Sequence, residues 1–286
     1  MAPLRPLLQP TATRPASNFN GKIPFQTVLI NNFQFSTWLL AAACVQGLLT
    51  WLFPTAFTFI PALLILLYRA LDVFLIMYGF RSNPYMHDVI KQKFSAQVPD
   101  DDGSFGERPS RKTVVVLLLG SKSNHPLGIL APQFIEVGNV FTAMVKDLEE
   151  NREEYGFITS TSWINNTDPN VNAAREGMTV FYFQSVEGLH KFAHGEIHRK
   201  GWDWWNRTIK QNDQISIMHE VWEAPAGSWE NIYINYRPTG FAKGMFPINR
   251  DGAEKGETGS EKQWIGNIVD ASKMNMKSSN NRLGRV

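Results

Sequence analysis

The sequence is poor in cysteine and in net charge, and both shortages exclude classes of protein. Its 286 residues include one cysteine, Cys44, so the chain can form neither an intramolecular disulfide nor a metal site built from several cysteines. A reducing, cytosol-facing compartment fits this best. The net charge of +2 at pH 7 gives no sign of a nucleic-acid-binding surface. Because the chain also lacks a glycine-rich loop with phosphate-binding spacing, we expect no tightly bound nucleotide cofactor.

What the chain does have is a dense apolar block over residues 33–80. Residues 36–53 (STWLLAAACVQGLLTWLF) contain no charged side chain and would span about 27 Å as a helix, enough for a bilayer core. A proline ends this stretch, and residues 55–80 form a second one that contains Arg69 and Asp72. Their spacing of three permits them to pair on one helix face, which would reduce the cost of charge at this depth. The block predicts a two-helix membrane hairpin.

The charges that flank the block predict its orientation. Basic residues lie before and after the hairpin, and the short connection has none (Arg5, Arg14, Lys22, Arg81, Lys91 and Lys93). By the positive-inside rule both termini face the cytosol, and we expect the membrane of the endoplasmic reticulum. A cleaved signal peptide is disfavoured because a long, mixed polar segment precedes the first apolar stretch. Two alternatives stay open: a hairpin that enters one leaflet only, and a buried helical pair in a soluble oligomer.

The rest of the chain predicts one α+β domain. We expect a cytosolic segment at residues 1–32, a linker at 81–112, the catalytic domain at 113–249 and a mobile tail at 250–286. The linker is rich in Asp, Gly, Pro and Ser, and the tail is polar and rich in Gly and Ser. These compositions set the domain boundaries.

Periodicity within the domain predicts the order β-α-β-β-α-β followed by one further strand. Residues 113–119 (TVVVLLL) are typical of a strand buried on both faces, and apolar spacings of three and four predict a helix that ends near Tyr155. The second helix is predicted over residues 186–207, and the other strands over 157–163, 178–183, 214–222 and 229–236. This order is that of the ferredoxin-like fold. Since one copy leaves a sheet face uncovered, we expect a homodimeric α+β barrel.

The second helix and the strand after it carry four of the six histidines. His190, His194 and His198 recur at spacings of four and so share a helix face, and His219 lies on the strand. The period of two places His219 and Glu220 on opposite sheet faces. Because imidazole titrates near neutral pH, His198 and His219 are the candidates for acid–base catalysis, with Glu220 as a candidate general base.

Aromatic residues beside the histidines predict an apolar cavity between the sheet and the two helices. We expect Trp202 and Trp205 to line it, together with His194 and Phe183. Each feature has a plainer interpretation. Tryptophans more often pack than stack on a cofactor, although three within four residues suggest a large apolar pocket or a membrane-facing edge. His219 suits a satisfied core residue, and Glu220 suits an ion pair. Histidines four apart without carboxylate or cysteine ligands nearby more often form a solvated face, so we predict no metal site.

Three segments carry a family resemblance: VFYFQS, VEGLHKFAHGEIHRKGWDWWNR and ISIMHEVWEAPAGSWENIYINYRPTG. With the two-span anchor, they resemble the fungal membrane-associated monooxygenase-like proteins of terpenoid and other secondary-metabolite pathways, of the fumagillin-pathway type. The match covers residues 33 to about 246. That family is similar to the antibiotic biosynthesis monooxygenases, dimeric α+β barrels that often act without flavin, haem or metal. The resemblance implies cofactor-independent oxidation of a hydrophobic small molecule.

A shorter likeness leads to the haem-containing aldoxime dehydratases, in which a helix histidine binds iron and a strand histidine is the distal acid–base group. Carried onto this chain, His198 would be the axial ligand of haem b and His219 the acid–base group. Two alternatives to a monooxygenase therefore stay open. One is a haem-dependent lyase or dehydratase, and the other is a non-catalytic, membrane-tethered module that binds a pathway partner.

Overall fold

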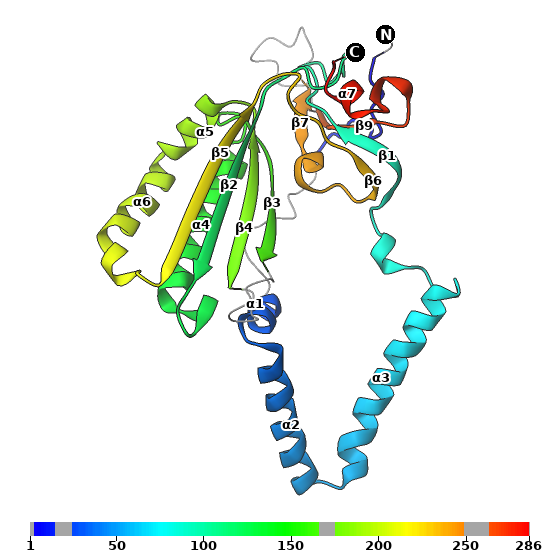
Figure 1. The fold of residues 1–286 in the computed structure, drawn as a ribbon, viewed down its shortest axis with the longest axis vertical. Coiled ribbons are helices and arrows are strands. Elements are labelled where there is room, and N and C mark those ends of the chain that lie inside the picture. The colour runs from blue at the N-terminus through cyan, green and yellow to red at the C-terminus, as the bar shows by residue number, and fades with distance from the viewer. Residues whose placement is uncertain (1–2, 15–24, 166–174, 249–262, 286) are drawn as a thin grey trace.

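A computed structural model describes residues 3–14, 25–165, 175–248 and 263–285. An antiparallel sheet with helices on one face lies at the centre, and a smaller β layer packs on part of the other face (Figure 1). Two long apolar helices lie below the domain in Figure 1, at the end of the central sheet away from the smaller β layer. The chain is therefore a mixed α+β domain joined to an apolar helical hairpin.

The central sheet has four strands in the order β3-β4-β2-β5, and each neighbouring pair is antiparallel. Its strands are β2 (Val114–Ser123), β3 (Phe157–Asn165), β4 (Glu176–Phe183) and β5 (Ile215–Ala224). The β-α-β-β-α-β order predicted from the sequence is present in these elements and the helices between them. Alternate residues of each strand point to opposite faces, so the register of β2 with its neighbours decides which side chains meet the helices.

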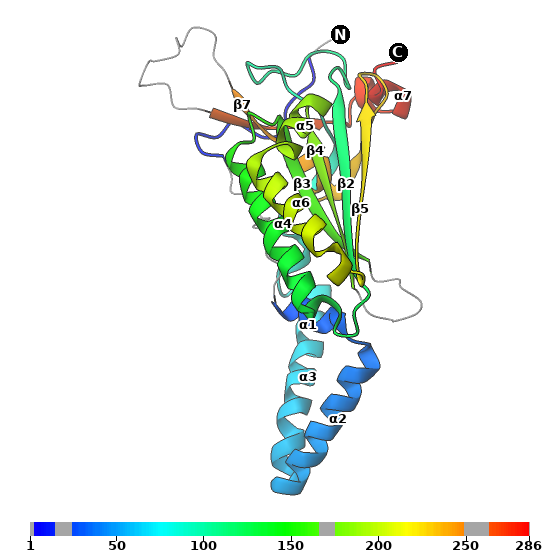
Figure 2. The same cartoon turned by 90° about the vertical axis from the view of Figure 1, so that its left-hand side faces the viewer.

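Helices cover one face of this sheet (Figure 2): α4 (Pro132–Glu150), α5 (Val186–Ala193) and α6 (Glu196–Thr208). Their apolar stripes pack on alternate strand residues to form a core (Val115, Leu117, Val145, Leu148, Phe181, Phe183, Leu189 and Phe192). Ser185 caps α5 as expected, accepting a hydrogen bond from the Gly188 N–H at 3.1 Å. The single helix predicted over residues 186–207 is wrong, because the chain leaves the helix at His194 and restarts after Gly195.

A second, smaller core lies against the other face of the sheet. Its strands form the order β6-β1-β9 with the pair β7-β8 beside them: β1 (Ile90–Ala96), β6 (Tyr233–Tyr236), β7 (Met245–Ile248), β8 (Gln263–Gly266) and β9 (Ile268–Asp270). Phe94 and Val269 are completely buried in it, and Val114 and Ile158 join it from the central sheet. Short 3₁₀ turns link the elements: η1 (Pro84–Met86), η2 (Gly128–Leu130), η3 (Ile209–Gln211), η4 (Gly240–Lys243) and η5 (Met274–Met276).

This second core corrects the predicted boundaries. Residues 81–112 were expected to form a linker, yet they contain β1. The expected mobile tail supplies β8, β9 and α7 (Ser279–Arg282) over its described part, while residues 249–262 lie outside the described residues. The N-terminal segment contributes Leu4, which is 5% exposed. The strand predicted at 229–236 shortens to β6 and pairs with β1 instead of the central sheet. Short strands with distant partners leave little trace in local composition.

The hairpin consists of α2 (Phe35–Leu52) and α3 (Thr55–Met77), and none of their residues is buried. Both helices are long and apolar enough to cross a membrane. Their outer ends lie on the side of the domain, where the short α1 (Phe25–Asn32) joins α2 (Figure 1). The spacing of three permits Asp72 to pair with Arg69, but Asp72 forms its ion pair with Arg81, beyond the end of α3.

Candidate functional site

The predicted catalytic histidines lie on the same side of the central sheet. In the register of β2 with β5, His219 is opposite Leu119, whose side chain packs on the helix-covered core. His198 lies in the first turn of α6, on that same side. The two imidazoles are close enough for a positive charge on His219 to lower the pKa of His198. The structure thus brings together two residues that are 21 positions apart in the sequence.

A close contact between two helices positions His198. Gly201 of α6 packs against α4 so tightly that a Cβ atom there would lie 2.5 Å from Cε of Met144 and 2.6 Å from Cγ1 of Val140. Only glycine lets the helices approach this closely. One turn earlier, the His198 ring meets the Phe192 ring edge-on, with centroids 5.3 Å apart. The imidazole therefore sits against the core with one side directed away from it.

Burial lowers the pKa of His198 below its ordinary value of 6.5, and this is the largest effect on the group. A hydrogen bond to the Ala193 carbonyl opposes it, and charges on His194 and His219 lower the pKa further. A histidine with a lowered pKa is neutral at pH 7 and has a nitrogen lone pair available. His198 is therefore poised to accept a proton or to bind a metal ion.

Apolar side chains surround this pair. Trp202 and Trp205 follow His198 by four and seven residues and so share its helix face. Trp202 is 58% exposed, and Trp205 is partly buried. On β5, Ile217 and Val221 flank His219 on the same sheet face, and each is 44% exposed. We call these six residues the histidine site (His198, Trp202, Trp205, Ile217, His219 and Val221). It is an accessible apolar surface with two imidazoles in it.

Two other candidate residues, Glu220 and Phe183, lie elsewhere, whereas a charge on His194 lowers the pKa of His198 more than one on His219 does. Glu220 is opposite Leu118 in the ladder, so its exposed side chain projects from the sheet face away from His219, as the period of two predicts. His194 is exposed at the end of α5, with its ring 6.3 Å from that of His190. Phe183 is completely buried in the core beneath α4 and α5, 5.5 Å from the Phe157 ring. Neither Glu220 nor Phe183 can therefore contact a ligand at the histidine site.

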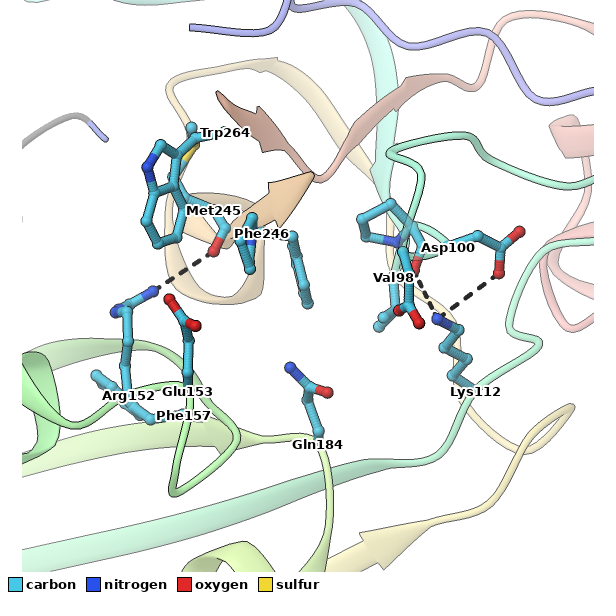
Figure 3. A pocket seen from close by; sticks show the side chains of 13 residues that line it. Val98, Asp100, Lys112, Arg152, Glu153, Phe157, Gln184, Met245, Phe246 and Trp264 are labelled. Atoms are coloured by element: carbon cyan, nitrogen blue, oxygen red, sulfur yellow. Dashed lines mark hydrogen bonds and ion pairs between the residues drawn. The ribbon is translucent and has the colours of Figure 1, made fainter. Parts of the chain in front are cut away.

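A pocket of about 210 Å³ lies elsewhere, where the two cores meet (Figure 3). Charged and amide side chains line much of it, including Lys112, Glu153 and Gln184. Arg152 is buried at its wall and donates hydrogen bonds to Glu149 at 3.1 Å and to the Met245 carbonyl at 3.4 Å. Burial lowers its pKa to about 10. Sequence reasoning missed this arginine, whose only local signal is a glutamate three residues earlier.

The pocket does not coincide with the predicted apolar cavity. Its polar lining suits structural ion pairs between the two cores better than it suits an apolar substrate. Among the described residues there is also no group of three or more His, Cys, Asp or Glu side chains placed to hold a metal ion. The histidine site is thus the surface in the described part of the chain that combines proton-transfer groups with apolar contacts.

Comparisons with known proteins assign the family. A family model described as monooxygenase af470-like matches residues 114–241, which contain the central sheet and its helices. Monooxygenase af470 of Aspergillus fumigatus is 31% identical over 284 residues, covering 99% of this chain and 98% of the relative. The chain belongs to the monooxygenase af470-like family. The histidine site and the apolar hairpin both lie within the aligned length, and membership supports an oxidoreductase.

Solved structures give a weaker likeness. A crystal structure of the aldoxime dehydratase OxdRE with butyraldoxime aligns with a TM-score of 0.38 at 15% identity, over 45% of this chain and 36% of that one. An antibiotic biosynthesis monooxygenase from Deinococcus radiodurans aligns with a TM-score of 0.27 at 11% identity, over 41% of this chain and 98% of that one. TM-scores of this size do not establish a common fold.

Replacing Phe183 with alanine in this family member should affect stability more than substrate binding. Because Phe183 is fully buried, we expect a loss of about 3–5 kcal/mol in the free energy of unfolding of the domain. Thermal unfolding of the detergent-purified protein measures the loss. Trp202→Ala is the matched control, since Trp202 is mostly exposed and its removal should change stability little. A rise in KM for Phe183→Ala without a loss of stability would contradict this and show that Phe183 contributes to ligand binding.

Proposed function

We propose that this protein is a membrane-anchored monooxygenase that oxidises a hydrophobic, terpenoid-like or polyketide–terpenoid intermediate of secondary metabolism. The observation that carries the proposal is the pair His198 and His219, which lie on the same side of the central sheet beside tryptophan and aliphatic side chains in a member of a monooxygenase family. The unburied apolar hairpin supports a substrate that collects in a membrane. We place this membrane in the endoplasmic reticulum, with the domain facing the cytosol.

The chemistry that suits two imidazoles is proton transfer. In a cofactor-independent reaction the substrate itself reduces dioxygen, which requires that its enol or phenol be deprotonated first. A methylene group beside that enol becomes a carbonyl, one oxygen atom of O₂ stays in the product, and the other leaves as water with the two methylene hydrogens. Neutral His198 is suited to remove the first proton, and His219 to return protons to the leaving oxygen. Trp202 and Trp205 would hold the apolar part of the substrate.

We also propose that two copies pair through the face of the central sheet that carries no helices. Apolar side chains on that face are exposed below the second core: Trp163 (50%), Met178 (37%), Met218 (42%) and Trp222 (59%). A soluble surface rarely leaves such a face uncovered. A second copy that covers it would complete the homodimeric barrel of ferredoxin-like domains that the sequence predicts.

An absorbance spectrum with metal analysis of the detergent-purified protein tests the cofactor side of this proposal. We expect no visible band, no stoichiometric metal, and oxygen uptake when an acidic apolar probe such as an anthrone is added. A Soret band that disappears in His198→Ala would instead identify a haem b enzyme with His198 as the axial ligand. A protein with neither a cofactor nor oxygen uptake toward any acidic apolar probe would favour a non-catalytic, membrane-tethered module.

A further inference from the structure

We infer that the hairpin-proximal end of the catalytic domain forms a second membrane contact, in which half-exposed aliphatic side chains rest on the lipid surface. This inference rests on the membrane anchoring proposed above. It concerns three residues that we call the apolar rim: Leu127 directly before the turn η2, Ile135 in the first turn of α4, and Ile209 in η3, each 50% exposed. The geometry points to the lipid bilayer as the partner of the apolar rim.

The first step is a rigid connection between the hairpin and η2. Asn32, the last residue of α1, is completely buried. Its side chain donates to the Leu127 carbonyl at 2.8 Å and accepts from the Ile129 N–H at 2.9 Å. At Gly128, where φ is +60°, a Cβ atom would lie 1.9 Å from Oδ1 of Asn32, so glycine is required for this contact. The turn cannot move away from α1 without breaking these bonds.

An arginine strengthens the same connection. Arg175, which precedes β4, donates to the backbone carbonyl of Asn32 at 3.3 Å, and also to those of His125 at 3.0 Å and Pro126 at 3.2 Å. It therefore ties α1, the η2 turn and the central sheet into one unit. Trp38 of α2 also donates to the Ile30 carbonyl of α1 at 3.2 Å, so one particular end of the domain is held toward the hairpin (Figure 1).

The second step is the short distance between Asn32 and the start of the first apolar helix. The first apolar helix begins at Phe35, three residues after Asn32, so the chain between them can span at most about 11 Å. An apolar helix starts near the edge of the hydrocarbon core, and the interfacial layer outside that core is roughly 5–8 Å thick on each side. The η2 turn is bonded to Asn32 and hence lies within or beside this layer. Leu127, which precedes this turn, is half exposed.

The C-terminal end of the hairpin indicates the same position for the membrane–water interface. Tyr78 and Phe80 directly follow α3 and are 63% and 77% exposed, and Tyr85 in η1 is 85% exposed. Aromatic side chains are enriched at membrane–water interfaces, where their rings sit among the headgroups. Both outer ends of the hairpin lie on the side of the domain (Figures 1 and 2), so both would meet the interface on that side.

The third step places Ile209 with Leu127. The loops that contain them are joined by a backbone hydrogen bond from the Asn124 N–H to the Gln214 carbonyl at 2.8 Å, and Asn124 also donates to Ser216 at 3.0 Å. The rim therefore runs along one end of the domain, from η2 through the start of α4 to η3. Ile209 follows α6, so the rim leads along that helix to Trp205, Trp202 and His198. A substrate dissolved in the membrane would meet the histidine site from this end.

Site-directed labelling of the full-length chain tests the inference. Since Cys44 is the one cysteine, Cys44→Ala gives a background into which Leu127→Cys, Ile135→Cys or Ile209→Cys can be placed for a bimane label. Glu187→Cys, exposed at the start of α5 at the other end of the domain, is the matched control. Each variant is reconstituted into phosphatidylcholine vesicles with and without lipids that carry a nitroxide near the headgroup. The protein labelled at native Cys44, which lies at the middle of α2, is reconstituted with lipids that carry the nitroxide at the end of the acyl chain.

We expect nitroxide lipids to quench the three rim labels and to leave the Glu187→Cys label unchanged. Quenching of a label on native Cys44 but not of the rim labels would overturn the inference while leaving the anchor in place. No quenching even at Cys44 would overturn the anchoring proposal and this inference with it. Rim labels that are shielded from iodide in detergent and unquenched in vesicles would show that a protein surface, such as a second copy, covers the rim instead.

Discussion

Replacing His219 with alanine is expected to lower turnover by about 10²- to 10⁴-fold, the usual contribution of a positioned acid–base group. The side chain lies at the exposed surface of β5, so its loss leaves no cavity in the core and the domain should unfold at the same temperature as the wild type. Oxygen uptake with the anthrone probe gives the rate, and thermal unfolding verifies the fold.

His198 should give a related loss with a distinct pH signature. Burial lowers its pKa below 6.5, and its neutral form is the one that accepts a proton. The rate for the wild type should therefore be constant above pH 6.5 and fall as the pH drops through the lowered pKa, where the imidazole becomes charged. His198→Gln should remove this acid limb along with most of the activity.

His190→Ala is the control for both substitutions. His190 lies exposed on α5, away from the histidine site, and its replacement should leave both the rate and the pH profile unchanged. Wild-type turnover in His219→Ala, or an acid limb that persists in His198→Gln, would exclude the proposed roles. Loss of activity in all three variants together would indicate a general effect on α5 and α6.

The second large effect concerns the hairpin. Val45 lies near the middle of α2 and is 57% exposed, and α2 is the less apolar of the two spans. An arginine at the centre of a transmembrane helix costs about 2.5–3.5 kcal/mol of insertion free energy. We expect the wild-type protein to stay in the membrane pellet after carbonate extraction, and a larger share of Val45→Arg to appear in the supernatant, with α3 retaining the rest. Val45→Ala, which adds no charge, should remain in the pellet.

Wild-type protein in the supernatant would contradict membrane insertion and favour a buried helical pair in a soluble oligomer. A hairpin that enters one leaflet would also resist extraction, so the connection between the helices needs its own assay. An N-glycosylation acceptor inserted after Pro54 should be modified in microsomes if the hairpin crosses the bilayer, because the connection would then face the lumen. An unmodified acceptor would indicate a one-leaflet hairpin.

The sequence predicts those parts of the fold whose signals are local. The run at residues 113–119 identifies β2, and the period of two correctly separates His219 from Glu220. By contrast, β1 and β9 pair across more than 170 residues, and no local window contains both. The pairing of Asp72 with Arg81 was missed for a similar reason: the arginine lies beyond the helix and reaches back to it.

The positions of the candidate residues were predictable only in part. The periods of helix and strand place His198 and His219 on the same side of the sheet, as the structure has them. The local sequence around Phe183 is the same whether this strand residue packs in a core or lines a cavity. The packing of α4 and α5 over the sheet decides this, and that packing depends on side-chain volumes spread over several elements. The break at Gly195 is a local feature, since its N–H bonds back to the Phe192 carbonyl three residues earlier to end α5.

Labelling with ¹⁸O₂ tests the central claim most directly. Full-length protein in vesicles is supplied with an apolar extract of acidic, terpenoid-like compounds under ¹⁸O₂, and the products are compared by mass spectrometry with those of His219→Ala. The account predicts a product that gains one ¹⁸O atom with the wild type and is nearly absent with the variant. Incorporation of both oxygen atoms, or an equal yield of labelled product from the two proteins, would contradict a histidine-dependent monooxygenase.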